Sequence, residues 1–482
     1  MTKKSISRLL QASLMCCLAV LFTACDDIFA SEDNPIPAYL SISDKPVTIK
    51  VGDTYRRKAI SVTTAVVEYS SSKTDVATVD NEGLVIAKAE GTTTITATAT
   101  GYSSQNGKKI YQPASVSYVV TVVPATVFAT SLTLNKTTEV LAKNGDALTI
   151  TATATPSEAT FTWESSDEAV ATVADGVVTP KGAGIATITA KSGDVKATCE
   201  VFVGNEVDLG TKTDDYTVQN YDILKGTLNS SYAISIPNDI KVVFNGVQTT
   251  EQIICSGDAT IILADGSTNT VTAVSTDGNA GIKIGGTGTT LTINGETAGT
   301  GQLTAQGGYY AAGIGTNYAY SSAMTGGYIV INGGTVTATG GTYGAGIGTG
   351  RASSSYSNTC GDITINGGTV TATGGKYAAG IGTGMNYSSN TCGNITIGTG
   401  VTKVTATKGE DSPNSIGVGY KYGGTQNCGT ITFGTAEVFD GTAATGTWTP
   451  NPMAAGTYGG LTLAISTTTN ANDTWTLTPV AP

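Results

Sequence analysis

One internal repeat constrains the fold of this chain more than any other feature. Residues 331–341, which read INGGTVTATGG, recur without change at 365–375, so the period is 34 residues. A second segment, 343–350, recurs with small changes at 377–384. Near-identical repeats of about 20–50 residues are typical of structural units that stack on their neighbours, because one unit alone cannot bury its apolar face.

Each repeat predicts three short strands separated by glycine-rich corners. In one repeat the expected strands are residues 363–365, 369–373 and 378–383, and a polar loop at 385–391 completes the circuit. Glycine supplies the backbone angles that tight corners need. Units stacked about 4.8 Å apart would form long parallel sheets, with Ile and Val inside and Thr facing either side.

This repeat region resembles the right-handed pectate-lyase-like superfamily. The segments before it, 242–247 and 261–266, resemble the carbohydrate-binding β-helix domains of bacterial surface proteins. The resemblance implies a right-handed parallel β-helix over 205–435. An open β-helix would polymerise at its ends, so we expect 436–482 to cap it. A calcium-binding β-roll is the competing fold, but its glycine–aspartate nonapeptides are absent.

Two shorter stretches, 38–124 and 126–204, repeat each other. Each has an aromatic residue followed by polar residues, then a Val-Ala-Thr-Val motif, then a closing run that begins with glycine and alternates Thr with Ile or Ala. This order resembles bacterial immunoglobulin-like group 2 domains, which implies two β-sandwiches. Tyr69 and Trp163 are expected to fill the space between the sheets. The predicted fold is all-β: two Ig-like sandwiches followed by a right-handed parallel β-helix.

The first residues predict export. Three basic residues lie within the first eight, and an apolar run from 9 to 24 follows, which is too short to span a membrane and fits the core of a signal peptide. Small residues stand immediately before Cys25, which resembles the lipobox of bacterial lipoproteins. The resemblance implies a signal peptide over 1–24, cleavage before Cys25 and a lipid on its sulfur.

A polar linker at 25–37 would follow the anchor. Asp26 and Asp27 resemble the acidic surface-export signals of Bacteroidota lipoproteins, although an aspartate there in enterobacteria would suggest retention at the inner membrane. We expect the protein at the outer membrane, on the cell surface, and in contact with the membrane through the lipid anchor alone.

Charge and composition exclude several classes of function. Loss of three basic residues with the signal peptide would leave 23 basic against 37 acidic residues, a net charge of −14. Binding of nucleic acid needs concentrated Lys and Arg, so no nucleic-acid partner is expected. The chain has no histidine, which excludes His-based triads and His metal sites.

The cysteines do not predict a disulfide framework. Five would remain beyond the anchor, an odd number far apart and without a CxxC pair: Cys199, Cys255, Cys360, Cys392 and Cys428. Buried free thiols are expected. The last three share one repeat position, where an earlier copy has Gly326, and predict a packed ladder of small residues.

The coil offers little for catalysis. A pectin lyase needs acids clustered around calcium and a basic residue that takes a proton, and the repeats supply only Arg351 and Asp362. Asp258, Asp265 and Asp277 are the best remaining acids, but each lies in a glycine-rich turn, where aspartate usually bonds to the backbone. We expect no enzyme activity, no catalytic residue, no metal ligand and no cofactor.

Tyrosine is the residue type that suggests a ligand. Eleven of the 21 tyrosines lie between positions 309 and 422. Tyr310, Tyr343 and Tyr377 hold one repeat position and should stack on neighbouring coils, while Tyr318 and Tyr387 lie in the loops. A flat aromatic row beside hydroxyls and amides suits sugar rings, which have apolar faces and polar edges. A ladder that only stabilises the stack is the alternative.

The leading hypothesis is a non-catalytic surface protein that binds an extracellular glycan through these five tyrosines, with the sandwiches as a stalk. A structural adhesin that contacts proteins or a host or cell-surface component is a second hypothesis. A degenerate polysaccharide lyase is a third.

Overall fold

The computed structural model describes residues 36–37, 40–61, 66–99, 111–273, 276, 278–353, 355–439, 454–467 and 473–480. The predicted signal peptide, the lipidation at Cys25 and the acid Asp277 lie outside these ranges. The chain divides into two compact units, one made of residues 1–128 with 158–160, the other of 129–157 with 161–482.

The predicted fold class is confirmed. Nearly every element is a strand, and the only helix among the described residues is a 3₁₀ turn, η1, at Leu209–Thr211. Within the part of the chain that is described, we find no helix with the length and apolar character needed to cross a membrane.

The first unit is a β-sandwich. Its larger sheet has the order β3 (Val47–Lys50), β11 (Ala114–Val123), β9 (Gly91–Ala99) and β6 (Val67–Ser71). The smaller sheet has the order β4 (Thr54–Arg56), β8 (Leu84–Ala87) and β7 (Ala77–Val79). Two short pairs complete it: β2 (Leu40–Ser41) with β5 (Ile60–Ser61), and β1 (Ile36–Pro37) with β10 (Tyr111–Gln112).

The second unit begins with a sandwich of the same design. Strands β16 (Thr162–Ser165), β19 (Gly184–Ser192), β20 (Val195–Asp208) and β13 (Thr138–Ala142) form one sheet. Strands β14 (Leu148–Thr149), β18 (Val177–Pro180) and β17 (Ala171–Ala174) form the other. Strand β12 (Ser131–Leu134) pairs with β15 (Ala152–Thr155).

The two sandwiches share one packing detail. Tyr69 in the first and Trp163 in the second each pack against the local apolar core, as predicted. Gly83 and Gly176 hold φ angles of +76° and +79°, and a Cβ on either would press on that aromatic ring. The phenol of Tyr69 also accepts a hydrogen bond from the backbone N–H of Ala59 at 2.6 Å. Both aromatic rings are therefore structural.

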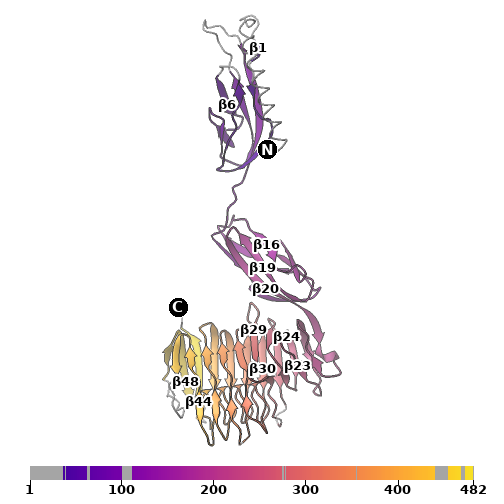
Figure 1. The fold of residues 1–482 in the computed structure, drawn as a ribbon, viewed down its shortest axis with the longest axis vertical. Coiled ribbons are helices and arrows are strands. Elements are labelled where there is room, and N and C mark those ends of the chain that lie inside the picture. The colour runs from indigo at the N-terminus through magenta and orange to yellow at the C-terminus, as the bar shows by residue number, and fades with distance from the viewer. Residues whose placement is uncertain are drawn as a thin grey trace, which may run out of the picture. The chain divides into compact units, whose positions relative to one another are not determined.

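The rest of the second unit is a coil whose parallel strands form four ladders, seen as stacked arrows in Figure 1. Ladder A contains β21 (Tyr216–Thr217), β23 (Ile234–Ile236), β25 (Ile253–Cys255), β28 (Ile282–Ile284), β31 (Ile314–Gly315), β35 (Ile347–Gly348), β39 (Ile381–Gly382) and β43 (Ile416–Gly417). Ladder B contains β22 (Asp222–Thr227), β24 (Ile240–Thr249), β26 (Ala259–Leu263), β29 (Thr290–Gly295), β33 (Tyr328–Ile331), β37 (Ile363–Ile365), β41 (Ile395–Ile397) and β45 (Ile431–Phe433). Ladder C runs from the end of β24 through β27 (Thr268–Thr272), β30 (Gln302–Gln306), β34 (Thr335–Thr339), β38 (Gly368–Thr373) and β42 (Val401–Thr407). Ladder D contains β32 (Met324–Thr325), β36 (Asn358–Thr359), β40 (Asn390–Cys392) and β44 (Gln426–Cys428).

Identical positions on successive coils lie in register. Ile363 of β37 pairs with Ile329 of β33 on one side and with Ile395 of β41 on the other. The Ile side chains of these strands point inward into one continuous apolar core, and the residues between them, such as Thr364 and Val330, stay partly exposed. The predicted alternation follows from the two-residue period of a strand.

Ladder D occupies the segment that the sequence predicted as a polar loop. Asn390 of β40 is fully buried, and its Nδ2 donates to the backbone carbonyl of Gly384 at 3.0 Å. Gln426 of β44 donates in the same way to Gly419 at 2.7 Å. Inward amides here satisfy backbone carbonyls, so the strand lacks the apolar alternation that would have revealed it. The strand expected at 378–383 is also shorter, since β39 covers only Ile381–Gly382.

Antiparallel strands cover the last coils. Strand β46 (Ala436–Phe439) folds back on β45, and β49 (Asp473–Pro479) pairs with β42 and with β48 (Leu461–Thr467). Strand β47 (Gly456–Tyr458) completes this group. Phe433, from the last coil, contacts the rings of Tyr458 and Trp475 edge to face. Trp448, the other tryptophan of the expected cap, lies outside the described residues.

The second sandwich and the coil share a strand. Strand β20 pairs with β13 and β19 of the sandwich and, at Asn205–Asp208, continues into parallel pairing with β22 of the coil. Strand β20 therefore extends beyond residue 204, which the sequence analysis predicted as the last residue of the second sandwich.

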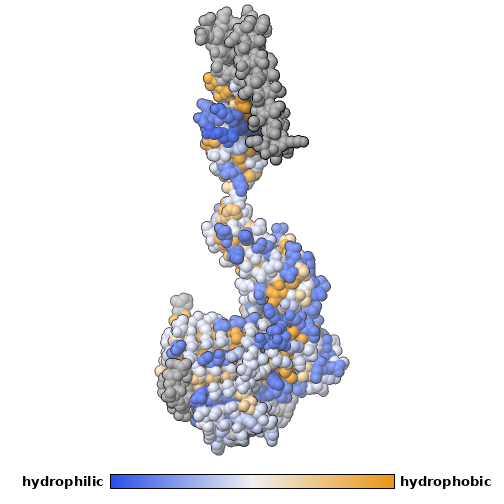
Figure 2. Space-filling model, viewed as in Figure 1, coloured by the Kyte–Doolittle hydropathy of each residue, from blue (hydrophilic) through white to orange (hydrophobic). Residues whose placement is uncertain are grey.

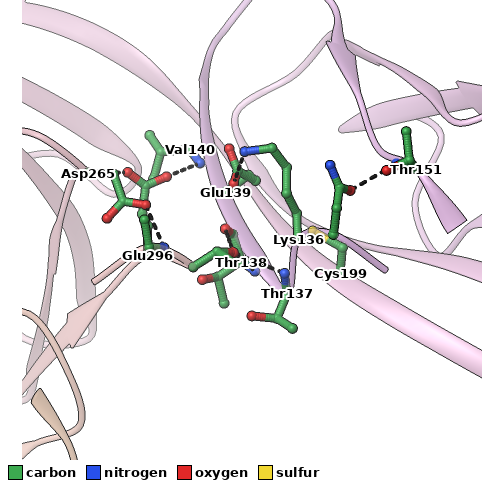
Figure 3. A network of polar contacts seen from close by, with 12 residues as sticks. Lys136, Thr137, Thr138, Glu139, Val140, Thr151, Cys199, Asp265 and Glu296 are labelled. Atoms are coloured by element: carbon green, nitrogen blue, oxygen red, sulfur yellow. Dashed lines mark hydrogen bonds and ion pairs between the residues drawn. The ribbon is translucent and has the colours of Figure 1, made fainter. Parts of the chain in front are cut away.

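A turn between β29 and β30 fastens the coil to the sandwich a second time (Figure 3). The two carboxylate oxygens of Glu296 accept hydrogen bonds from the backbone N–H groups of Val140 and Asp265, both at 2.6 Å. The hydroxyl of Thr297 accepts from the N–H groups of Thr137 and Thr138 at 2.9 Å and donates to the carbonyl of Thr138. The sandwich and the coil are thus joined by side-chain bonds as well as by backbone.

We expect Gly382→Ala to destabilise the coil strongly. Gly382 has a φ of +130°, and a Cβ there would overlap the backbone of Gly417 on the next coil. A strained backbone and an overlap in a packed core together cost roughly 3 kcal/mol or more. Chemical unfolding monitored by circular dichroism measures the loss. Gly398→Ala is the matched control, because a Cβ there makes only ordinary contacts. Equal stability of the two variants would contradict the packing described.

The Glu296 junction should make stability depend on pH. The pKa of Glu296 is raised from its ordinary 4.5 to about 7. Burial is the largest cause, and the negative charges of Glu139 and Asp265 add to it, whereas the two backbone N–H bonds oppose it. Because the native state binds this proton more tightly than the unfolded state, the stabilisation is complete below pH 4.5 and is lost as pH rises through about 7. After solvent screening we expect a fall of roughly 1–3 kcal/mol.

Unfolding free energies at several pH values test this dependence. Glu296→Gln, which cannot titrate, should flatten the decline between pH 4.5 and 7 relative to the parent. Glu200→Gln, an exposed change on β20, is the control and should leave the decline as it is. A Glu296→Gln profile parallel to that of the parent would refute the assignment.

Candidate functional site

Tyrosine rings from successive coils stack beside ladder A. The ring centroids of Tyr310 and Tyr343 lie 5.4 Å apart with planes 12° from parallel, and those of Tyr343 and Tyr377 lie 5.2 Å apart at 8°. Backbone bonds hold these residues in place: the N–H of Tyr343 donates to the carbonyl of Tyr309, and that of Tyr377 donates to Thr342. Equal repeat positions thus bring three of the predicted tyrosines together.

Further tyrosines lengthen the stack at both ends. Tyr318 stacks on Tyr310 at 4.8 Å and contacts Tyr320 edge to face. At the other end Tyr420 tilts against Tyr377 at 5.7 Å. We call the connected set the tyrosine strip; it comprises Tyr309, Tyr310, Tyr318, Tyr320, Tyr343, Tyr377, Tyr387, Tyr420 and Tyr422.

The strip is not the flat row of ring faces that the sequence suggested. Tyr310 and Tyr377 cover the two faces of Tyr343, so this ring can present only its edge and hydroxyl. The most exposed rings are at the ends: Tyr320 is 77 % exposed and Tyr422 is 72 % exposed, whereas Tyr309, within the strip, is 40 % exposed. Tyr422 stacks on Tyr387 at 5.2 Å, which supports it from one side. Ring faces for a ligand are therefore offered by the end tyrosines.

Arg351 joins the stacked tyrosines to those in the loops. The guanidinium carbon lies 5.0 Å from the ring centroid of Tyr343 and 4.8 Å from that of Tyr387, with Tyr310 and Tyr318 at 5.3 and 5.8 Å. Its Nε is buried and has no hydrogen-bond partner among the described residues. Attraction between the guanidinium and the four surrounding rings holds the side chain in this position.

Two columns of residues on successive coils contribute five of the nine tyrosines of the strip. The first holds Tyr310, Tyr343 and Tyr377. The second is marked by equivalent backbone bonds to those residues: the N–H of Arg351 donates to Tyr310, that of Met385 to Tyr343 and that of Tyr420 to Tyr377. Tyr318 precedes them, with its N–H bonded to Gly278. The second column therefore reads Tyr318, Arg351, Met385 and Tyr420.

Sequence reasoning missed part of this arrangement because the second column changes residue type from coil to coil. Arg351 was considered only as a base for lysis, and Tyr309, Tyr420 and Tyr422 were not selected. One signal was available in the sequence: Tyr387 and Tyr422 each stand three residues after the glycine that closes the Ile-Gly segment, Gly384 and Gly419. The structure confirms the equivalence, because Asn386 forms a bridge with Lys421. Aligning the loops as well as the repeats would have paired the two tyrosines.

The electrostatics of the strip are mild. Burial, followed by a hydrogen bond with Tyr309, raises the pKa of Tyr343 above its ordinary value. Lys376 lies beside Tyr377 with its Nζ 5.5 Å from the ring centroid, and it pairs with Glu410 at 3.7 Å and Asp411 at 3.6 Å. The face of the coil in view in Figure 2 is mostly pale, the colour of residues of intermediate hydropathy.

The acids that the sequence singled out have structural partners. The carboxylate of Asp258 accepts from the N–H of Thr290, and that of Asp265 accepts from the N–H groups of Ala298 and Thr300. Asp362 accepts from the N–H of Asn394 at 2.7 Å, on a turn leading into ladder B, and forms no ion pair with Arg351. Among the described residues no three His, Cys, Asp or Glu side chains gather as a metal site.

The comparisons with known proteins match the two kinds of domain. The model of the bacterial Ig-like domain (group 2) matches residues 39–109 and 128–201, and the model of the β-helix repeat matches 329–351 and 363–385. No curated protein matches the sequence.

Three solved structures that are similar to part of the chain have low scores. A mouse cadherin-23 fragment, EC22-24, is 16 % identical over 36 % of this chain and 65 % of its own length, less than two thirds, with a TM-score of 0.20. Mouse protocadherin-24 EC1-3 is 15 % identical over 36 % of this chain and 71 % of its own, with a TM-score of 0.20. The surface layer protein SbsC, domains 1-6, is 17 % identical over 35 % and 28 %, with a TM-score of 0.17.

The family matches and the fold agree on the architecture. The chain combines two bacterial Ig-like domains of group 2 with a domain of β-helix repeats.

Proposed function

We propose that this chain is a non-catalytic cell-surface protein that binds extracellular carbohydrate along the tyrosine strip of its β-helix. The Ig-like and β-helix domains are of a surface or adhesion type. The observation that supports a ligand is the strip itself: nine tyrosines in continuous ring contact, with one arginine among them, on one side of the coil.

The geometry favours an extended ligand. Tyr318 and Tyr420 hold one position on coils that are three steps apart, a distance on the order of 15 Å for parallel strands. The open rings of Tyr320 and Tyr422 lie next to these two residues and suit the apolar faces of sugars. Between them the stack presents phenol edges and hydroxyls, which suit the polar edges of sugars. An oligosaccharide lying along the coil would use both.

The contacts of the charged residues support a binding rather than a catalytic role. Arg351 lies among tyrosine rings, Asp362 bonds to the backbone of Asn394, and Glu410 with Asp411 pairs with Lys376. A lyase would need a free base beside a cluster of acids. In this proposal the sandwiches act as a stalk, and the lipid on Cys25 holds the protein at the outer membrane.

A glycan array with the full chain carrying Cys25→Ser, which keeps it free of lipid, tests carbohydrate binding. The double variant Tyr320→Ala, Tyr422→Ala should weaken binding to any positive glycan by about tenfold or more, since each stacked ring contributes roughly 0.5–1.5 kcal/mol. Tyr328→Ala is the matched control, because this tyrosine is 40 % exposed on β33 and outside the strip. Tyr343→Phe keeps the stack and removes one hydroxyl, so it reports on the row of phenols alone.

The outcomes separate the candidate functions. A folded parent that binds no glycan but captures a purified surface protein through the same tyrosines would favour the adhesin, since Tyr and Arg also dominate protein interfaces. Release of an unsaturated uronate from pectin would restore the lyase hypothesis. Unchanged glycan binding by the Tyr320, Tyr422 double variant would remove the strip as the site.

The anchor has its own test. In a bacterial host that processes lipoproteins, the parent should incorporate labelled fatty acid at Cys25. It should also sediment with membranes, because the two or three acyl chains of a lipoprotein are enough for stable attachment. Cys25→Ser should abolish the label and release the protein. Cys17→Ser, within the expected signal peptide, is the control and should keep both. A labelled Cys25→Ser variant would contradict the predicted lipidation.

A further inference from the structure

Three buried cysteines form a column inside the last coils of the β-helix. Cys392 of β40 pairs in register with Cys428 of β44. One coil earlier, the N–H of Cys360 donates to the carbonyl of Thr391 at 2.8 Å, which continues the same ladder. All three side chains are at most 4 % exposed and belong to the single apolar core of the coil.

Cys392 lies between the other two along the ladder, in register with Cys428 on one side and next to Cys360 on the other. Neighbouring parallel strands are about 4.8 Å apart, and disulfide-bonded cysteines have Cα atoms roughly 4.4–6.8 Å apart. Their side chains also point the same way, into the core. Cys392 can therefore reach either neighbour with a small shift, whereas Cys360 and Cys428 are two coils apart, roughly 9–10 Å, too far to join each other.

We propose that Cys392 is a disulfide-forming residue that bonds to Cys360 or to Cys428 and so clamps two successive coils covalently. One of the three thiols then stays free. That thiol, as its thiolate, can attack the Cys392 sulfur of the disulfide, which forms a new bond to Cys392 and releases the other end cysteine as a thiol, so the clamp can pass from one pair of coils to the other by exchange. The structure holds the reduced form, with all five described cysteines free and buried.

The chemistry needs a disulfide as oxidant, either a small molecule or an oxidoreductase. The thiolate of one cysteine attacks the oxidant and releases one of its sulfurs as a thiol, which leaves a mixed disulfide on the protein. The second cysteine then displaces the remaining half as another thiol. Two protein thiols lose two electrons and two protons, and the oxidant gains them. Hydrogen bonds to the two neighbouring thiols and burial raise the pKa of Cys392, so the closed coil reacts slowly and the bond forms while the last coils are open, during folding.

Peptide mapping tests the clamp on the full chain. The protein is refolded in a buffer of oxidised and reduced glutathione, its free thiols are blocked with N-ethylmaleimide under denaturing conditions that expose the buried cysteines, and it is digested and analysed by mass spectrometry without reduction. We expect peptides that link Cys392 to Cys360 or to Cys428. Dithiothreitol should then lower the melting temperature by roughly 5 °C or more, because the bond closes a loop of more than 30 residues.

Two variants test whether the links and the effect of dithiothreitol depend on Cys392. Cys392→Ala should abolish both links and the effect of dithiothreitol on melting. Cys255→Ala, another buried cysteine of the same core, is the matched control and should keep both. Complete blocking of all three thiols in the refolded parent would overturn the proposal, and so would a link between Cys360 and Cys428. The map of the parent decides the question even if Cys392→Ala fails to fold.

Discussion

Close backbone contact between equal positions on successive coils is the constraint on which the rest of this structure depends. At Gly315, Gly348 and Gly382 the chain approaches the next coil so closely that the space of a Cβ is already filled by the carbonyl of the equivalent glycine on that coil. Only glycine fits, and the positive φ angles at these positions again favour glycine. Because a slip of one residue would place a side chain there, the register is fixed, and every other position of the repeat becomes a column.

The same register explains both the stability and the reach of the tyrosine strip. Rings that repeat at one position must lie one above another at the spacing of the coils, so Tyr310, Tyr343 and Tyr377 stack face to face. Stacking stabilises that corner, but it removes the faces of the inner rings from solvent. Recognition of a flat apolar surface then passes to the ends of the strip, where the stacking partners stop. The guanidinium of Arg351 lies among four rings that come from the stack and from the loops. Its attraction to these rings holds the loop tyrosines against the stacked ones.

The sequence predicted the structural features that arise from identical residues at equal repeat positions. It did not predict the features in which the residue type changes from coil to coil. The coil, the inward Ile and Val, the two sandwiches and the column of Tyr310, Tyr343 and Tyr377 all follow from exact or near repetition. Ladder D was mistaken for a loop because Asn390 and Gln426 are buried by bonding to carbonyls, which no hydropathy pattern records. The sequence did not predict the column of Tyr318, Arg351, Met385 and Tyr420, because these residues occupy equivalent positions on successive coils but differ in type.

The attachment of the coil to the second sandwich bears on how such a surface could act. A flexible linker would leave the strip free to turn, but β20 passes from one domain to the other without leaving its sheet pairing. Glu296 and Thr297 then tie a later turn of the coil to β13 and to the residue before it, on the same sandwich. Two attachments at separate points resist rotation, whereas one would permit it. The direction of the strip is therefore fixed relative to the second sandwich, so a long ligand would be presented in one orientation by this unit.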